Sequence, residues 1–316
     1  MKHLRSLFDL SVDEYHEILD LADSLKRKLG QGQRPDLLKN RSLALLFEKS
    51  SLRTRVSFEA GMIQLGGAAI YLTNDVGWRE RETIADFVRV LSGYCDFVVC
   101  RAISQSTVDE LASHNVLPVI NGLTDQSHPC QAMADMMTMR EFSNGELKGK
   151  QLTFVGDGNN VARSLIKSAA ICGMKFKLVG PAKYHIDQQF LERIREHFGQ
   201  LDFEQGTDTK SLVRDADFLY TDVWTSMGQE AEAKARSTDF VPYQINAPMM
   251  QFAPAHCKVL HCLPARRGLE ITDDVIDSPS SIVFPQAANR MHLQKSLLVW
   301  LGIKNGFVQS SQLNLS

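Results

Sequence analysis

Short apolar runs alternate with longer amphipathic stretches along almost the whole chain, and this alternation is the feature that most restricts its fold. The apolar runs that we expect to be strands span 42–47, 68–72, 96–100, 117–120, 151–155, 175–179, 217–220, 258–262 and 281–284. The helices expected between or beside them span 53–65, 79–94, 106–115, 128–142 and 159–173. Strands that are apolar on both sides and separated by helices are typical of parallel sheets covered on both faces.

The pattern therefore predicts an α/β protein with two doubly wound parallel-sheet domains joined by interdomain helices. A chain of 316 residues has room for about two domains. The polar stretch 143–150, with two glycines, marks the boundary. We expect one domain at 1–142 and another at 147–285, with a last helix at about 286–303 that lets 286–316 pack back on the first domain.

Charge and composition exclude several classes of protein. Lys plus Arg number 35 and Asp plus Glu number 37, so a formal charge of −2 argues against a dedicated nucleic-acid binder. There is no run of 18 apolar residues, so we expect no membrane partner. The first nine residues lack the apolar core of a signal peptide, and the six cysteines form no Cys-x-x-Cys pair. These features predict a cytoplasmic protein with reduced thiols.

The segment after the first strand has the composition of an anion site. Ser51, Leu52, Arg53, Thr54 and Arg55 stand where a helix begins. A helix start offers unbonded N–H groups and partial positive charge, and guanidiniums and hydroxyls beside it favour phosphate. The alternative for this segment alone is a capped surface helix with solvated arginines.

Two further strand ends in the first half carry groups compatible with the same anion. Arg101 follows one strand directly, and His128 and Gln131 open the helix after another. In open α/β sheets, ligands bind at the carboxyl ends of the strands. Three such turns together favour function over a structural role for His128.

The second half opens with a glycine turn that resembles a dinucleotide fingerprint and fails it. Gly156 and Gly158 are present, but Val161 stands where the third glycine belongs. No acidic residue ends the next strand, which runs into Gly180. The turn can still bring Asn160 over a ligand.

Two strand ends in this half carry groups suited to an amine. Asp222 follows one strand and is a candidate to bind an ammonium group, with Ser226 and Met227 at the next helix start. Cys262 ends another strand, where a partly exposed thiol near cations has a lowered pKa. The alternatives are a solvated capping segment and a buried, inert cysteine, and the pattern alone does not separate them.

A metal site at the two His-Cys pairs is disfavoured. His256 and Cys257 precede His261 and Cys262 by five residues. Neighbouring residues of a strand point to opposite faces, so the four side chains cannot easily meet around zinc.

Taken together, these segments resemble the aspartate/ornithine carbamoyltransferase family over nearly the whole chain. The motifs that carry the resemblance are Ser51 to Arg55, His128-Pro129-Cys130-Gln131, Asp222 to Gly228 with Ser-Met-Gly at its end, His261-Cys262-Leu263-Pro264, and Asn289-Arg290-Met291-His292-Leu293-Gln294-Lys295. The Ser-Met-Gly segment is the piece that separates ornithine from aspartate enzymes. Each motif is modest alone, and their order and spacing make the resemblance specific.

The resemblance implies transfer of a carbamoyl group from carbamoyl phosphate to the δ-amine of L-ornithine, in a homotrimer with active sites near subunit interfaces and without metal or organic cofactor. It assigns carbamoyl phosphate to Ser51, Leu52, Arg53, Thr54, Gly77, Arg101, His128, Gln131, Cys262, Leu263 and Arg290. It assigns ornithine to Asn160, Asp222, Ser226 and Met227. Cys262, Asp222, Arg101 and His128 are the implied catalytic groups, with Cys262 orienting and deprotonating the amine rather than forming a covalent bond.

The chain departs from the family pattern at four places. Leu52 replaces Thr, Arg266 stands where His is common, and Ala288 replaces a Glu before Arg290. The fourth departure is a loop in which Gly77 replaces the Gln that reaches a neighbouring subunit's carbamoyl phosphate, followed by Trp78. We expect this loop to raise the KM for carbamoyl phosphate or to alter the choice of acceptor.

Three competing interpretations fit parts of the same pattern. Aspartate, putrescine or N-acylated ornithine are alternative acceptors, against which Asp222, Ser226 and Met227 argue. A catalytically silent trimer subunit is a second, against which the retained Arg53, Arg101, His128, Cys262 and Arg290 argue. An NAD-dependent dehydrogenase is a third, against which Val161 counts.

Overall fold

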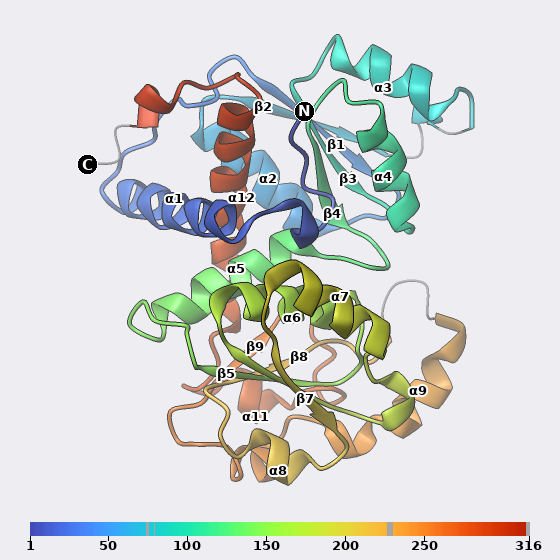
Figure 1. Cartoon of the computed structure of the whole chain (residues 1–316), viewed down its shortest axis with the longest axis vertical. Helices are drawn as coiled ribbons and strands as arrows, with labels where there is room; N and C mark the ends of the chain where they lie inside the picture. Colours follow the sequence, from blue (N-terminus) through green and yellow to red (C-terminus); the bar gives the residue numbers. More distant parts are fainter. Residues whose placement is uncertain (74–75, 79, 226–229, 314–316) are drawn as a thin grey trace. The chain divides into compact units, whose positions relative to one another are not determined.

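The structure is a computed structural model that describes residues 1–73, 76–78, 80–225 and 230–313. It divides into two compact units, one formed by Met1–Met137 with Asn289–Ser316 and the other by Thr138–Ala288. The chain passes between the units within helix α5 (Pro129–Glu141) and within helix α12 (Val283–Lys304) (Figure 1). Each unit is an α/β fold with one parallel sheet, as the alternation of strands and helices predicts.

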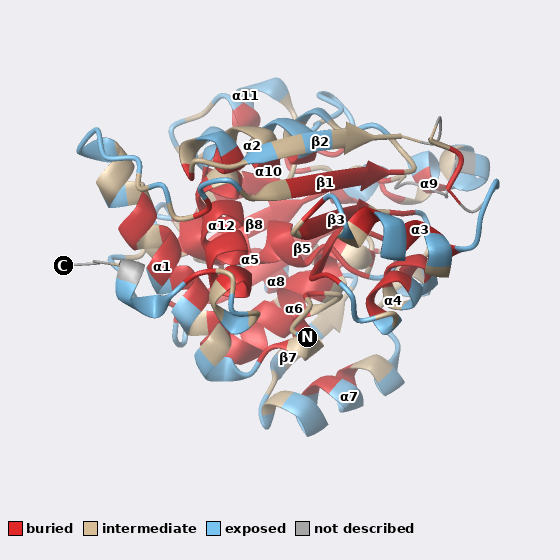
Figure 2. Ribbon diagram, turned by 90° about the horizontal axis from the view of Figure 1, so that it is seen from above, coloured by how far each residue is buried: buried red, intermediate tan, exposed pale blue. Residues whose placement is uncertain are grey.

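The first unit is built on a four-stranded parallel sheet in the order β2-β1-β3-β4. Its strands are β1 (Ser42–Phe47), β2 (Ala68–Leu72), β3 (Phe97–Arg101) and β4 (Val119–Leu123). Its helices, besides parts of α5 and α12, are α1 (Val12–Gly30), α2 (Leu52–Gln64), α3 (Ile84–Ser92) and α4 (Gln105–Ser113). Strand β1 is central and buried from Leu43 onward, whereas the edge strand β2 is only partly covered (Figure 2).

The second unit is built on a five-stranded parallel sheet in the order β7-β6-β5-β8-β9. Its strands are β5 (Gln151–Val155), β6 (Lys175–Val179), β7 (Asp202–Gly206), β8 (Phe218–Thr221) and β9 (Lys258–His261). Its helices are α6 (Asn160–Cys172), α7 (Gln188–Phe198), α8 (Thr209–Val213), α9 (Ala233–Asp239), α10 (Ala247–Met250) and α11 (Asp273–Ile276).

Most predicted elements are present, and the exceptions have physical reasons. The strand predicted at 281–284 is wrong: Ser281 makes a single bridge to Val259, and α12 begins at Val283. The helix predicted at 79–94 begins later, because the Thr83 side chain accepts from the Asp86 amide and caps α3. Strand β7 was not predicted, because this half-exposed edge strand reads as polar.

Helix α12 packs against α2 within the first unit through a close polar contact. Lys295 Nζ donates to Gln64 Oε1 at 2.9 Å, and Gln64 Nε2 lies 3.3 Å from Met291 Sδ. A Cβ added at Gly61 would lie 3.1 Å from Lys295 Cγ, so glycine lets the two helices approach. This packing holds the helix that begins with the Ser51–Arg55 segment.

Burial of Lys295 makes stability depend on pH. Lys295 is only 3% exposed. Burial, together with the nearby charge of Arg34, lowers the pKa of its ammonium group from 10.5 to about 8. The unfolded chain therefore binds more protons between pH 8 and 10.5, and the free energy of unfolding rises with pH across this window. Below pH 8 the buried charge opposes folding by roughly 3 kcal/mol, from 1.36 kcal/mol per pKa unit.

We therefore expect Lys295→Met to be more stable than the unmodified chain at pH 7, with the difference shrinking as pH rises from 8 to 10.5. Denaturation by guanidinium chloride at pH 7 and pH 10, followed by circular dichroism, measures this. Lys39→Met, at an exposed position, is the control. An equal stability difference at both pH values would contradict the prediction.

Among the described residues, no helix is long and apolar enough to cross a membrane.

Candidate active site

The first group of predicted site residues lies where the strand order of the first sheet reverses. The chain proceeds from β1 to β2 on one side and then to β3 on the other side of β1. Such a switch point leaves a crevice outside the carboxyl ends of the two central strands. The short segment 48–51 joins the end of β1 to the start of α2, and β3 ends at Arg101, so both groups lie at this crevice.

The start of α2 is organised as an anion site. Ser51 is its N-cap, and the Ser51 Oγ accepts from the Thr54 amide at 3.3 Å. The side chain of Leu52 is turned to solvent in a residue 73% exposed, so only its backbone belongs to the helix start. The first amides of a helix carry partial positive charge and lack partners within the helix. This geometry suits a phosphate held by backbone and hydroxyl donors.

Arg290 is held against this helix start. Its Nη2 donates to Thr54 Oγ1 at 2.9 Å, and the residue is only 3% exposed. Burial, together with the charges of Arg290 and Arg101, holds the pKa of His128 well below its usual value. His128 is therefore neutral at physiological pH and offers one N–H donor rather than a third positive charge.

Gln131 carries a buried acceptor that nothing in the described structure satisfies. The residue is fully buried in α5, and its Nε2 donates to Asp135 Oδ1 at 2.8 Å. This bond fixes the carboxamide, yet Gln131 Oε1 accepts no hydrogen bond from any described residue. Buried polar atoms are almost always paired, so an unpaired oxygen here indicates a ligand that brings an N–H donor.

Gly77 lies in the loop before α3, and no described contact joins it to Thr54 or Arg290. It is buried at a φ of 71°, and an added Cβ would lie 2.7 Å from Arg81 Cδ. Trp78 is 4% exposed, with its ring centroid 5.9 Å from that of Phe87. The tryptophan thus anchors the loop in the core of the first unit.

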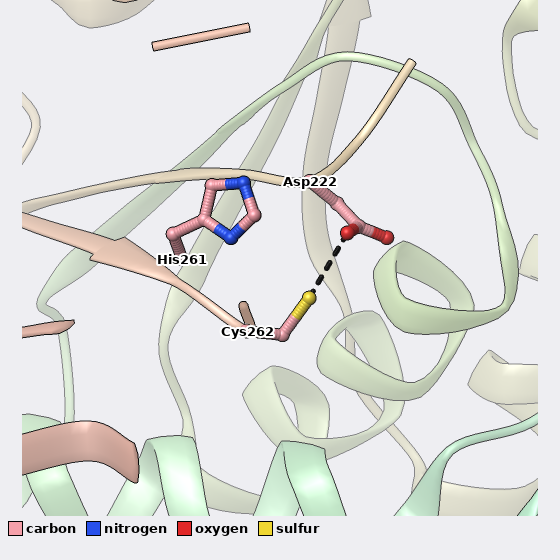
Figure 3. A group of neighbouring side chains, drawn as sticks. All are labelled: Asp222, His261 and Cys262. Carbon is pink, nitrogen blue, oxygen red and sulfur yellow. Dashed lines mark hydrogen bonds between the residues drawn. The ribbon is translucent and has the colours of Figure 1, made fainter. Parts of the chain in front are cut away.

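The second group of predicted residues lies at the corresponding switch point of the second sheet, between β5 and β8. Asp222 follows β8 and Cys262 follows β9, and their side chains point toward one another (Figure 3). Cys262 Sγ donates to Asp222 Oδ1 at 3.0 Å, and the Val223 amide donates to the same oxygen at 2.8 Å. The predicted pair is therefore in contact in the described structure.

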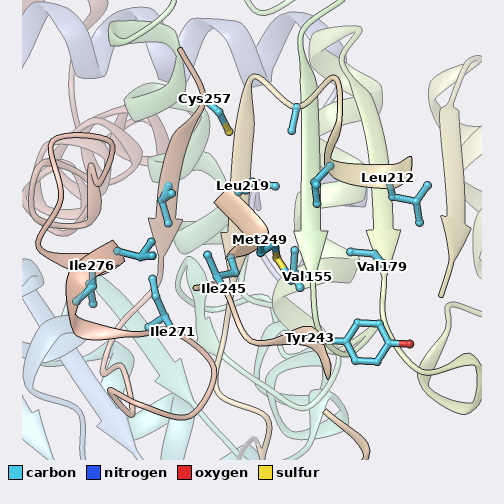
Figure 4. Close-up of a cluster of buried hydrophobic side chains, with 14 of the residues drawn as sticks. Val155, Val179, Leu212, Leu219, Tyr243, Ile245, Met249, Cys257, Ile271 and Ile276 are labelled. Atoms are coloured by element: carbon cyan, nitrogen blue, oxygen red, sulfur yellow. The ribbon is translucent and has the colours of Figure 1, made fainter. Parts of the chain in front are cut away.

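A buried apolar cluster fixes the strands that carry this pair (Figure 4). Val155, Leu219 and Val259 come from neighbouring strands and are fully buried in it. Ile245 and Ile271 cover them and are also fully buried. Burial of each such side chain stabilises the fold by roughly 1.5–3 kcal/mol. This buried cluster fixes the positions of the strand ends, and therefore the positions of Asp222 and Cys262.

Two neighbouring asparagines follow β5, and they differ in exposure and in hydrogen-bond partners. Asn160, the predicted ligand, accepts from the Val161 amide at 3.0 Å and is partly exposed at the start of α6. Asn159 was not predicted: it caps α6, and its Nδ2 donates to Asp222 Oδ2 at 2.9 Å. The preference of asparagine for helix N-caps could have identified Asn159 as the cap of α6. It could not have identified the hydrogen bond from Asn159 to Asp222.

His261 is part of the support of the Cys262 loop. Its Nδ1 accepts from the Leu263 amide at 2.8 Å, and its Nε2 lies 3.2 Å from Glu270 Oε1 in a fully buried pair. Leu263 has a φ of 55°, a region that bulky side chains rarely adopt, which is typical of strained segments at functional sites.

One group of side chains has the composition of a metal site. Ligand atoms of Asp222, His261 and Cys262 lie within 4.8 Å of one another. Both ring nitrogens of His261 are engaged by Leu263 and Glu270, so the imidazole has no lone pair left for a cation. The absence of a metal stays a prediction.

The cysteines differ in their surroundings. All six lie in the described part of the chain, and none forms a disulfide. Burial raises the pKa of Cys130, Cys172 and Cys257 to about 12. Cys262 is the one that is not fully buried. The predicted ligands Ser226 and Met227 lie outside the described residues.

The glycine turn after β5 is closed by its own unit. The Gly158 amide donates to the Tyr184 carbonyl at 2.9 Å, and a Cβ at Gly158 would lie 2.8 Å from Ile186 Cδ1. A cofactor pyrophosphate needs such amides and close backbone approach. The turn therefore serves packing, which weighs against a dinucleotide here.

Family models match both parts of the chain. Residues 2–141 match the carbamoyl-P binding domain of aspartate/ornithine carbamoyltransferase, and residues 148–301 match its Asp/Orn binding domain. The chain belongs to the aspartate/ornithine carbamoyltransferase family.

Individual relatives are similar over nearly their full length. An ornithine carbamoyltransferase of Archaeoglobus fulgidus is 47% identical, with 95% of this chain and 97% of the relative covered. The solved ornithine carbamoyltransferase of Pyrococcus furiosus has a TM-score of 0.90 at 45% identity, over 94% of this chain and 96% of that one. The solved anabolic ornithine carbamoyltransferase of Campylobacter jejuni has a TM-score of 0.90 at 32% identity, over 96% of this chain and all of that one.

Proposed function

We propose that this protein is an ornithine carbamoyltransferase, which transfers the carbamoyl group of carbamoyl phosphate to the δ-amine of L-ornithine and releases L-citrulline and phosphate. The observation that carries the proposal is the contact between the Asp222 carboxylate and the Cys262 thiol at a sheet switch point. The relatives named ornithine carbamoyltransferase support the same acceptor.

Carbamoyl phosphate binds to residues 1–142 with 286–316 in this proposal. The Ser51 hydroxyl, the Leu52 amide, Arg53 and Thr54 hold the phosphate. Arg101, His128 and Arg290 hold the carbonyl oxygen and the remaining phosphate oxygens. Gln131 Oε1, which has no hydrogen-bond partner among the described residues, accepts from the carbamoyl NH2. Fixed donors at the carbonyl oxygen stabilise the negative charge that develops when the amine attacks. The arginines neutralise the departing phosphate.

Ornithine binds to residues 147–285. An alkylammonium has a pKa of about 10.4, so the amine must lose a proton before it attacks. Asp222 and Cys262 orient it and take that proton, while Asn160, Ser226 and Met227 hold the α-amino and α-carboxylate groups. The amine nitrogen then bonds to the carbamoyl carbon, the bond from that carbon to the phosphate oxygen breaks, and the nitrogen gives its second proton to the departing phosphate. The Leu263 carbonyl accepts from the carbamoyl NH2. Positioning of both substrates in attack geometry supplies much of the acceleration.

The direct test offers carbamoyl phosphate with ornithine, aspartate, putrescine or N-acetylornithine in parallel and measures carbamoylated product. Citrulline from ornithine alone is the expected result. Carbamoylated product from another amine would show that this amine, rather than ornithine, is the acceptor. No product with any amine would indicate a silent subunit and overturn the proposal.

The proposal includes a cytoplasmic homotrimer with active sites near subunit interfaces. Apolar side chains support such an interface: Leu52, Val56 and Ile63 share one exposed face of α2, and Ile70 is 46% exposed on the edge strand β2. A hollow of about 400 Å³ between α2 and β2 includes Ser51 and Tyr71 in its lining. Sedimentation equilibrium distinguishes a trimer from a monomer.

We expect the Gly77 loop to weaken carbamoyl phosphate binding relative to a chain with glutamine there. A glutamine side chain at this position would strain the backbone at a φ of 71° and press on Arg81, so Gly77→Gln is best made together with Arg81→Ser. The double variant is expected to lower the KM for carbamoyl phosphate or to shift acceptor choice, measured against Arg81→Ser alone. Unchanged kinetics would show that the loop has no such role.

A further inference from the structure

Asn159 joins the start of helix α6 to the Asp222 carboxylate. Its Oδ1 accepts from the Val161 and Ala162 amides, both at 3.0 Å, and its Nδ2 donates to Asp222 Oδ2 at 2.9 Å. The residue is 8% exposed. Because the oxygen receives two backbone N–H groups, the orientation of the carboxamide is fixed, and only the nitrogen is left to face Asp222.

The carboxylate of Asp222 is thereby held at both oxygens. Oδ1 accepts from the Cys262 thiol and the Val223 amide, and Oδ2 accepts from Asn159. Donors on both oxygens restrict rotation about the bond to the carboxyl group. Without the hydrogen bond from Asn159, the Asp222 carboxylate group is less restricted in the orientation that directs Oδ1 toward Cys262.

We propose that Asn159 is a positioning residue for the reaction, which holds the Asp222 carboxylate aligned with the Cys262 thiol. This inference rests on the proposed function, in which Asp222 receives the proton of the acceptor amine. A helix cap needs only an acceptor, which Asp or Ser supplies as well as Asn. The carboxamide is the side chain that caps α6 and also donates to a carboxylate.

The surroundings of Asp222 allow the effect to be assigned. Among the described His, Cys, Asp and Glu residues, Cys262 and His261 form a group with Asp222 in which one ligand atom of each lies within 4.8 Å of the others. The His261 ring is held by Leu263 and Glu270. An added acid at position 159 would be the new charge that faces Asp222.

Asn159→Asp tests the proposal because it keeps the size of the side chain and the cap but replaces the donor by a second carboxylate. Two carboxylates in contact cannot both ionise easily, so one pKa rises. We expect the acid limb of the pH profile of kcat/KM for ornithine to move up by about one pH unit or more. On the acid limb itself, the rate at a given pH falls by about tenfold for each unit of this shift, while the melting temperature changes little.

A matched control makes the same change at another helix start of the same unit. Asn246 caps α10 through the Met249 amide at 3.0 Å, and its Nδ2 donates to Gln244 rather than to an acid. Asn246→Asp is expected to leave the pH profile unchanged. A profile of Asn159→Asp that superimposes on that of the unmodified enzyme would overturn the inference.

Two further outcomes are decided by separate measurements. If Asn159→Asp does not fold, Asn159→Ser keeps a cap without the donor. A loss of kcat/KM for ornithine of about threefold or more at unchanged melting temperature then supports the proposal, and no loss overturns it. Failure of the proposed function is distinguishable, because the unmodified protein would then form no citrulline at any pH.

Discussion

Replacing Asp222 by Asn is expected to lower kcat/KM for ornithine by about 100- to 10,000-fold, the range typical of a lost acid–base group. The substitution keeps the size of the side chain but removes the negative charge that, in the proposed mechanism, orients the amine and receives its proton. Asn159 Nδ2 and the Cys262 thiol both donate to Asp222. The amide nitrogen of the new asparagine would face one of these two donors, so one hydrogen bond would be lost as well. Citrulline formation at saturating carbamoyl phosphate measures the effect.

The control for this change is Asp215→Asn, at an exposed position of the same unit. It removes one negative charge outside the candidate site and is expected to leave the kinetics unaltered. Circular dichroism of both variants shows whether each one folds. A folded Asp222→Asn variant with less than a tenfold loss would exclude Asp222 as the group that accepts the proton.

The second large effect is expected at Arg290. Arg290→Gln removes a guanidinium that donates to Thr54 at the start of α2 and that adds to the positive charge beside His128. Loss of one fixed donor to a developing oxyanion typically costs about 100- to 1000-fold in rate. We expect a loss of that size in kcat/KM for carbamoyl phosphate, accompanied by a higher pKa of His128 because one of its two cationic neighbours is gone.

Steady-state kinetics with varied carbamoyl phosphate measure the loss, and titration of His128 by NMR measures the second effect. Arg89→Gln, on the exposed side of α3, is the matched control in the same unit. If the loss for Arg290→Gln did not exceed that for the control, the assignment of Arg290 to carbamoyl phosphate would be wrong.

Local patterns in the sequence were sufficient for most of the elements that carry the site. Strand β1 is apolar from Leu43 onward and could be predicted from its residues alone, as could the cap of α2 by Ser51. Strand β7 was missed, because its outer face is solvated and leaves little apolar signal. The start of α12 was misread, because its first turn is as apolar as a strand.

The contacts of the site depended on long-range packing. Asn159 and Asp222 are 63 residues apart, and Asp222 and Cys262 are 40 apart. Their meeting depends on β5 and β9 both lying beside β8, an order that no local pattern specifies. The same holds for Trp78, which the sequence shows only as a departure from the family pattern in a loop and which packs in the core.

The sequence by itself determined the α/β class, the positions of most strands and the candidate site residues, because these depend on side-chain periodicity and on motifs within a few residues of each other. The tertiary structure alone decided which strand ends meet at each switch point, that Asn159 holds Asp222, and that the buried Gln131 Oε1 has no hydrogen-bond partner in the described part of the chain. The physical reason is that strand order and hydrogen-bond satisfaction are set by packing between segments far apart in the chain.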